Sequence, residues 1–596
     1  MRFVWAVVAF FLAAACIGAG IAQRTVFMGP KTAQTEFEVS GDLPYTLIDG
    51  AVLATTSGAQ TLVVRGSDQV FAAYGRTVDM VGWLSDSSYN HVVLSGGKTV
   101  VEQVDNTPED GKASEHNPAV SDLWLDQFEE EGELTLPLKL PETMSILIAS
   151  DGTAPAPSDI SVSTPISNST PWAGPLMVLG GLFLLIGVVL WVLGIRHVRR
   201  SRGPRRKGLP APPTEAIDVA DDAAQKGVIS AGRRRRAITT GRRGFVVAPA
   251  VAVSALLFGG CSADAWPQFG AGASPSPSVS ETVIVPEGQQ QPAVTEPQAE
   301  RIIAEVAETV AEADEEKDAK AAAQRLTGPA LAERETNYTL RDKVKGQEAP
   351  AAIPSKPLAI LLPQQFDGWP RTVMSIVLDK DDETVAPTIM LMTQEDPWSK
   401  YKVSYLANLE AAAELPQVAP ADIGAIQVQP DSPFLVMEPG KLAKAYADVL
   451  NKGEKSTYAA MFDLANDHFH SSVAADREER LKAFNKTGKK TGELTFTSKP
   501  ADTPPLALAT LESGAIVAVH LHETDTVKAT NEDAVIKLKD NPTVKALAGV
   551  SQSATGFTTT FSDQLFFYVP TQGSSEKIRL LGYSSNILSA AVIKKK

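Results

Sequence analysis

The chain has 596 residues, a formal net charge of −15, 44% hydrophobic residues and two cysteines. This length allows about three or four domains. The negative balance excludes a general nucleic-acid-binding protein, because binding to phosphates requires a positive field. The two cysteines, Cys16 and Cys261, lie far apart, which excludes a disulfide framework, cysteine-based zinc sites and iron–sulfur clusters.

The first apolar segment covers residues 3–22 and contains no charged residue. About 20 apolar residues cross the hydrocarbon core of a membrane as a helix. A cleaved signal peptide is the alternative, but its basic region would be only Met1 and Arg2, and the apolar stretch exceeds the usual length. We therefore predict an uncleaved transmembrane helix over residues 1–24, followed by an outer domain over residues 25–171.

The second apolar segment, residues 172–195, has Trp172 and Trp191 placed to lie near opposite membrane interfaces. Residues 196–243 follow with fourteen Lys and Arg against four Asp and Glu. Positive residues stay on the cytoplasmic side, so we predict a second transmembrane helix followed by a basic cytoplasmic loop. A nucleic-acid-binding role for Arg233–Arg236 is the weaker alternative, because topology already explains these charges.

The third apolar segment, residues 244–261, follows a basic stretch and ends in LLFGGC, with small residues at Gly259 and Gly260 before Cys261. This pattern resembles a bacterial lipoprotein signal, in which the cysteine receives the lipid and becomes the new N-terminus. Phe258 and the internal position depart from that pattern, so an uncleaved third helix stays open. Either outcome places residues 262–596 outside the cytoplasm.

The outer domain at residues 25–171 shows short alternating apolar runs between turn residues, among them the candidate strands 51–55, 61–66 and 69–74. This pattern predicts an all-β sandwich. Residues 75–84 instead have apolar residues at helical spacing and predict a short helix. The segments GRTVDMVGWL and DLWLDQF resemble uncharacterised actinobacterial membrane proteins, a resemblance that implies no activity.

Residues 262–298 are rich in Pro, Ser, Gly and Gln and predict a flexible linker. Beyond it, helical patterns precede strand patterns, and the same order occurs twice, which predicts two α+β domains over residues 299–420 and 438–596. Two successive copies of this order resemble the nuclear transport factor 2-like (cystatin-like) cone fold. In that superfamily the concave face holds a catalytic pocket in some members and serves binding or assembly in others.

Few residues in the sequence indicate a catalytic, metal-binding or ligand-binding role. His520 and His522 would point to the same face of a strand and could hold one metal ion, although half-exposed sheet residues are the plainer interpretation. Trp369 and Trp398 lie in Pro-containing turns and could form a ligand-binding ledge, or could simply pack at strand ends. The sequence contains no nucleophile elbow, phosphate-binding loop, dinucleotide-binding glycine motif or zinc-protease helix motif.

We therefore expect a multi-pass, non-catalytic protein of the cell envelope that binds another envelope protein, a glycan or a lipid-linked molecule, without a cofactor. Two alternatives stay open: an enzyme with its pocket in one of the cone-like domains, and a transmembrane sensor. Neither the ligand nor the oligomeric state follows from the sequence.

Overall fold

The structure is a computed structural model of the whole chain. It describes residues 1–27, 32–39, 42–54, 60–108, 116–165, 171–201, 290–379, 384–411 and 413–595. Most of the predicted basic loop, the third apolar segment with Cys261 and most of the linker lie outside these residues. The chain divides into two compact units, residues 1–33 with 165–277 and residues 34–164 with 278–596.

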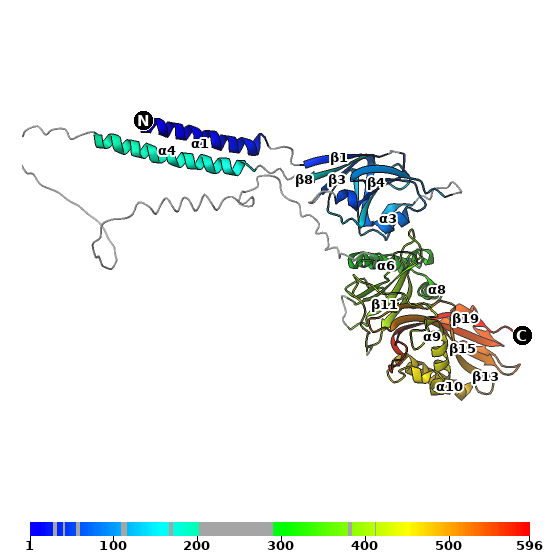
Figure 1. Cartoon of the computed structure of the whole chain (residues 1–596). Helices are drawn as coiled ribbons and strands as arrows, with labels where there is room; N and C mark the ends of the chain where they lie inside the picture. Colours follow the sequence, from blue (N-terminus) through cyan, green and yellow to red (C-terminus); the bar gives the residue numbers. More distant parts are fainter. Residues whose placement is uncertain are drawn as a thin grey trace, which may run out of the picture. The chain divides into compact units, whose positions relative to one another are not determined.

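The first unit contains two long apolar helices, α1 (Arg2–Thr25) and α4 (Ala173–Ser201), which lie side by side (Figure 1). Within them, Phe3–Thr25 and Ala173–Arg199 are long and apolar enough to cross a membrane. Both correspond to the segments that the sequence predicted.

Glycines of α4 allow the two helices to approach closely. A Cβ atom at Gly180 would lie 2.5 Å from Ile17, one at Gly187 would lie 3.1 Å from Phe10, and one at Gly194 would lie 3.0 Å from Phe3. The partner residue number falls as the glycine number rises, so the helices run antiparallel. Small residues at a helix interface are typical of helix pairs in membranes.

The second unit begins with a sheet domain, residues 34–164. Its elements are β1 (Thr32–Glu38), β2 (Tyr45–Asp49), α2 (Gly50–Leu53), β3 (Gln60–Arg76), α3 (Thr77–Trp83), β4 (Tyr89–Ser95), β5 (Lys98–Val104), η1 (Pro118–Val120), β6 (Asp126–Leu138), β7 (Met144–Ala149) and β8 (Asp159–Pro165). The predicted helix at residues 75–84 is α3. The predicted strand at residues 51–55 is wrong, because Gly50–Leu53 forms a helical turn.

The expected sandwich of two sheets is replaced by one mixed sheet in this part of the described chain. Its eight strands have the order β1-β8-β3-β7-β2-β4-β5, with β6 also paired to β3, and β2 and β4 are parallel. Strand β3 joins what the sequence separated into two strands. It pairs with β8 over Thr61–Arg65 and, after an irregularity between Arg65 and Gln69, with β7. A β-bulge bends a strand, so one long strand can serve two parts of the sheet.

The second part of this unit is the C-terminal domain, residues 290–595. Its helices are α6 (Glu296–Glu316), α7 (Ala319–Ala322), α8 (Gly328–Lys343), α9 (Pro439–Lys452), η3 (Gly453–Lys455), η4 (Ala459–Met461), α10 (His468–Thr487) and α11 (Pro542–Ala548). Its strands are β9 (Leu358–Pro363), β10 (Arg371–Val377), β11 (Thr388–Gln394), β12 (Lys402–Leu409), β13 (Gly492–Pro500), β14 (Leu506–Ala509), β15 (Ala515–Ala529), β16 (Ile536–Lys537), β17 (Gln552–Ser553), β18 (Gly556–Val569) and β19 (Arg579–Val592).

Nine of the described strands in this domain form one sheet with the order β13-β15-β18-β19-β12-β11-β10-β9, with β14 paired to β15. Helices α6 and α8 cover one face of β10–β12, and α9 covers one face of β15 and β18. The opposite faces of the two halves share a core that includes Leu391, Tyr405, Ile516 and Phe566. The sheet therefore folds over on itself, with helices on the outside.

The predicted order of helices followed by strands occurs twice, as the sequence indicated. The two halves are not separate sheets, however, because β12 pairs with β19 through Asn408–Tyr583 and Leu409–Gly582. The resemblance to cone-like domains and the boundaries at residues 420 and 438 stay predictions.

Candidate functional site

A pocket of the C-terminal domain lies where α8 meets the strands β12, β18 and β19. Thr327 precedes α8 and Pro329 lies in its first turn, where its missing N–H costs nothing. Glu333 and Asn337 are four residues apart and so project from the same face of α8. Ser584 and Asn586 are two residues apart on β19 and share one face of that strand.

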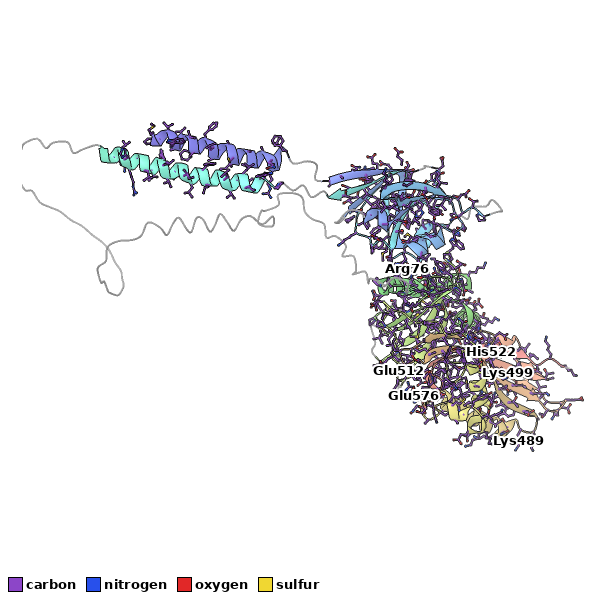
Figure 2. The ribbon with its side chains drawn as sticks, in the orientation of Figure 1. Arg76, Lys489, Lys499, Glu512, His522 and Glu576 are labelled. Carbon is purple, nitrogen blue, oxygen red and sulfur yellow. The ribbon has the colours of Figure 1, made fainter. Side chains whose placement is uncertain are left out.

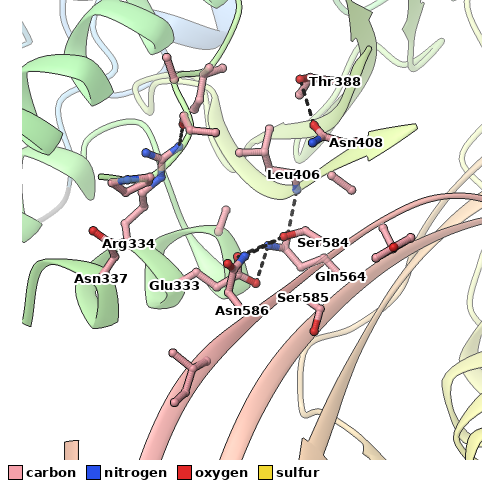
Figure 3. A pocket seen from close by; sticks show the side chains of 18 of the residues that line it. Glu333, Arg334, Asn337, Thr388, Leu406, Asn408, Gln564, Ser584, Ser585 and Asn586 are labelled. Atoms are coloured by element: carbon pink, nitrogen blue, oxygen red, sulfur yellow. Dashed lines mark hydrogen bonds between the residues drawn. The ribbon is translucent and has the colours of Figure 1, made fainter. Parts of the chain in front are cut away.

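These side chains meet around the carboxylate of Glu333. Its Oε1 accepts hydrogen bonds from Ser562 Oγ at 2.7 Å and Gln564 Nε2 at 2.8 Å. Its Oε2 accepts from Asn586 Nδ2 at 2.8 Å and Ser584 Oγ at 3.4 Å. Figure 3 shows Glu333, Gln564, Ser584 and Asn586 pointing toward one another. Burial raises the pKa of Glu333, and the four hydrogen bonds oppose that rise.

The hydrogen-bonded network continues behind Glu333 into the sheet. His520 Nε2 lies 2.9 Å from Ser562 Oγ, and His520 Nδ1 lies 3.0 Å from Thr503 Oγ1. Because Ser562 donates to Glu333, the consistent arrangement has His520 Nε2–H donating to Ser562 and Nδ1 accepting from Thr503. Burial, together with the smaller effect of the neighbouring His522, lowers the pKa of His520 to about 4.

A pocket of about 420 Å³ opens beside this network. Arg334 shapes one wall, because it forms an ion pair with Asp314 on one side and donates to the Ala351 carbonyl oxygen at 2.8 Å on the other. Asn337 lines the pocket, donates to the Glu348 carbonyl oxygen at 3.1 Å and has a buried Oδ1 without a hydrogen-bond partner. The remaining lining combines amides and hydroxyls with apolar side chains: Gln347, Thr388, Asn408, Tyr583, Ser585, Leu340, Ile353 and Ile587.

This arrangement does not match a nucleophilic catalytic centre. In a Ser–His–acid triad the histidine accepts the serine proton and the acid accepts from the histidine. Here the serine hydroxyl donates directly to the carboxylate, and His520 lies on the far side of Ser562. Of the described residues that line the pocket, Glu333 alone carries a carboxylate, whereas glycoside hydrolysis ordinarily uses two.

The predicted metal ligands His520 and His522 lie together on β15, with ring centroids 4.9 Å apart, and His522 is labelled in Figure 2. Both nitrogens of His520 already have hydrogen-bond partners. The part of the chain that the structure describes contains no group of three or more His, Cys, Asp or Glu residues that could hold a metal ion. Metal binding by this pair stays a prediction, and the geometry supports a role for His520 in the buried network.

The predicted ledge residues Trp369 and Trp398 lie apart from this pocket. Both pack, partly buried, against the aromatic core of the sheet domain, which includes Trp83 and Trp124. Trp369 Nε1 donates to Gln394 Oε1 at 3.0 Å, and Trp398 Nε1 donates to the Trp83 carbonyl oxygen at 2.8 Å. Their placement matches the packing interpretation, and a ligand-binding ledge stays a prediction. Lipidation at Cys261 falls outside the described residues.

Sequence reasoning missed Glu333, Asn337 and Asn586. The available signal was weak: a Glu and an Asn four residues apart in ERETNY, and alternating polar residues in the strand sequence YSSNI. Either pattern alone is typical of a solvated surface. Only the fold brings α8 against β18 and β19.

The fold and the pocket define an α+β domain preceded by a mixed sheet domain and two apolar helices. Comparison with known families shows which group the chain belongs to. The model of a domain of unknown function, DUF8094, matches residues 290–591, half of the chain, and the chain belongs to this family.

One curated relative is an uncharacterised lipoprotein of Streptomyces avermitilis, 28% identical over 213 residues. The alignment covers 36% of this chain and 56% of that relative, so the chain spans about half the length of the relative it matches. No solved structure matches the chain. The lipoprotein relative and the two apolar helices both indicate association with a membrane.

Proposed function

We propose that this chain is a non-catalytic, membrane-anchored protein of the bacterial cell envelope that binds an uncharged glycan in the pocket beside Glu333. The lipoprotein relative supports the location. The chemistry of the pocket supports the ligand class. A protein partner and a lipid-linked molecule are the other ligands that the binding experiment must separate from a glycan.

The observation that carries the proposal is the density of amide and hydroxyl groups around one pocket. Asn337 presents a buried Oδ1 that lacks a partner, and a buried acceptor without a partner is costly unless a ligand or water satisfies it. Asn408, Ser585 and Gln347 add further donors and acceptors. Leu340, Ile353 and Tyr583 supply apolar surface. A sugar ring presents hydroxyls at its rim and C–H groups on its faces, and so matches such a mixed lining.

The state of Glu333 favours binding over catalysis. Both of its oxygens accept hydrogen bonds from the protein, so the carboxylate is held in place by four neighbours. A general base must reach the proton that it removes, and a carboxylate so engaged is poorly placed to do that. We therefore assign Glu333 the role of positioning Gln564, Ser584 and Asn586 at the pocket wall.

The contacts within the second unit support the proposed topology. The sheet domain and the C-terminal domain form one compact unit, so both must lie on the same side of any membrane. Helix α4 separates them along the chain and is long enough to cross a membrane. The chain would then have to return between residues 202 and 289, which is where the third apolar segment and Cys261 lie.

Titration calorimetry with the N-acetylglucosamine tetramer tests the ligand class, because this probe carries both hydroxyl and acetamide groups. We expect the purified full-length protein to bind it, and Asn337→Ala to weaken binding about fivefold, since one hydrogen bond contributes about 1 kcal/mol. The side chains that donate to Glu333 are Ser562, Gln564, Ser584 and Asn586, so this change leaves those four hydrogen bonds in place. Asn485→Ala, on the exposed face of α10, is the matched control and should bind like the wild type.

Two outcomes would overturn the proposal. Absence of binding, or equal binding by Asn337→Ala, would remove the glycan assignment. Release of shorter sugars from the tetramer, measured by chromatography, would show that the pocket is catalytic.

A further inference from the structure

Two acidic residues of the sheet domain face two arginines of the C-terminal domain. The first is Asp79 on α3, whose Oδ1 accepts a hydrogen bond from Arg371 Nη2 at 2.6 Å. Asp79 also pairs with Arg76 of its own domain at 2.7 and 3.0 Å. Asp79 and Arg371 are 2% and 0% exposed, so this ion pair is removed from water.

The second pair joins Asp122 to Arg325. The two guanidinium nitrogens of Arg325 donate to Asp122 Oδ2 at 2.6 Å and Oδ1 at 3.1 Å, which is the strong bidentate geometry. Asp122 Oδ2 also accepts from the backbone N–H of Tyr401 at 2.7 Å. Both side chains of the ion pair are 1% exposed. Both pairs place the acid on the sheet domain and the arginine on the C-terminal domain.

Polar contacts to the backbone surround these ion pairs. Gln298 Nε2 donates to the Asp122 carbonyl oxygen at 2.7 Å, and Arg301 Nη2 donates to the Trp124 carbonyl oxygen at 2.6 Å. In the opposite direction, Arg76 Nη1 donates to the Pro292 carbonyl oxygen at 2.9 Å. Arg76 lies at the edge of the sheet domain beside α6 (Figure 2).

Aromatic side chains complete the contact. His116 of the sheet domain stacks on Trp398 with ring centroids 5.1 Å apart and an interplanar angle of 13°. Trp369 lies against Gly82 of α3 so closely that a Cβ atom there would be 2.8 Å from two of its ring atoms. Central tryptophans and arginines carry most of the binding energy in protein–protein interfaces.

We infer that the sheet domain and the C-terminal domain are a docking pair that stays together when the chain between them is cut. A buried charge that loses its partner is strongly unfavourable, so an arrangement of the two domains that separates these ion pairs is disfavoured. The partner that fits this surface of the C-terminal domain is thus the sheet domain itself. Cleavage before Cys261 would leave the C-terminal domain bound to the membrane-held sheet domain, not merely tethered by a lipid.

A protease site inserted between residues 265 and 285 of the full-length protein tests this inference in isolated membranes. The cut lies after Cys261, so neither a third helix nor a lipid at Cys261 can retain the released fragment. After cleavage, membranes are sedimented and washed, and the C-terminal fragment is measured in pellet and supernatant. We expect the fragment in the pellet, and its release into the supernatant would overturn the inference.

Two variants test whether this interface is what holds the C-terminal fragment in the membrane pellet. Gly82→Leu places a side chain against Trp369, and the three atoms nearest to its Cβ all belong to Trp369. Asp122→Asn removes one charge of a buried ion pair and should weaken the contact at least about 30-fold. Both should release the fragment on cutting. Glu102→Gln, which removes one exposed charge elsewhere on the sheet domain, is the control and should retain it. Retention by both interface variants would contradict the assignment.

Discussion

Asp563 on β18 is a buried carboxylate with an incomplete set of hydrogen bonds. Its Oδ1 accepts from Ser585 Oγ at 2.7 Å, but its buried Oδ2 has no hydrogen-bond partner. Burial raises the pKa of Asp563 to about 7 from an ordinary value of 3.8. The hydrogen bond from Ser585 and the charge of Arg477 oppose the rise, whereas the carboxylates of Glu523 and Glu333 add to it.

This shift predicts a stability that depends on pH. The folded pKa of Asp563 exceeds its unfolded value, so the stabilising contribution is fully present below about pH 3.8 and is lost as the pH rises through about 7. Asp563→Asn keeps the acceptor for Ser585 and removes the charge. We expect it to stabilise the protein by up to about 4 kcal/mol at pH 8 and by less than about 2 kcal/mol at pH 5.

Thermal unfolding of the full-length protein in detergent at both pH values measures this difference. The matched control is Asp533→Asn, an exposed carboxylate in the same domain, which should change the unfolding midpoint little at either pH. An equal shift for Asp563→Asn at pH 5 and pH 8 would contradict the burial of an ionised carboxylate here.

The sequence predicted few of the individual residues that form the pocket beside Glu333. It drew attention to His520, but for metal binding, because alternation on a strand shows which residues share a face and not which partners they meet. The donors to Glu333 come from β18 and β19, more than two hundred residues further along the chain. No local sequence pattern indicates that residues so far apart form hydrogen bonds with each other.

At the scale of elements, a narrow join connects the two halves of the C-terminal sheet. Strand β19 runs beside β18 for most of its length and meets β12 near Gly582, where Glu410 N–H also donates to the Leu581 carbonyl oxygen at 2.9 Å. A Cβ atom at Gly582 would lie 2.5 Å from the Asn408 carbonyl oxygen and 3.0 Å from Leu409 Cα. Both contacts are to backbone, which cannot move without breaking the pairing.

Gly582→Ala should therefore disrupt the pairing of β12 with β19. We expect a loss of about 1–3 kcal/mol in the free energy of unfolding, the usual cost of forcing extra atoms into a packed region. Hydrogen–deuterium exchange should accelerate at the end of β12, residues 406–409, more than in β10. Ser589→Val adds atoms at an exposed position of the same strand and should leave exchange unchanged. If β12 is protected from hydrogen–deuterium exchange in Gly582→Ala as strongly as in the wild type, the proposed role of Gly582 in the β12–β19 pairing is wrong.

Periodicity predicted α3 and the order of helices before strands in the C-terminal domain, because apolar spacing determines which local structure can bury a face. It did not predict that β12 and β19 join two halves into one sheet. It also missed the single bent strand β3, because the polar residues between Arg65 and Gln69 look like a turn. Register and connection depend on contacts between distant segments, which spacing within a segment does not encode.

In the whole molecule, we expect the sheet domain and the C-terminal domain to lie on the same side of the membrane. Charge distribution predicted this from the basic stretch at residues 196–243, and the buried pairs Asp79–Arg371 and Asp122–Arg325 supply an independent reason. Two domains that share buried ion pairs cannot lie on opposite faces of a bilayer. The sequence could not predict those pairs, since each joins residues more than two hundred positions apart.

Cysteine labelling in intact cells tests this claim most directly. Single exposed positions, Glu131→Cys in the sheet domain and Glu478→Cys in the C-terminal domain, are treated with a membrane-impermeant maleimide before and after lysis. The chain without an added cysteine gives the background, and Gly208→Cys in the basic stretch reports the cytoplasmic side. We expect Glu131→Cys and Glu478→Cys to be labelled in intact cells and Gly208→Cys to be labelled only after lysis. Labelling of either outer position only after lysis would contradict this expectation.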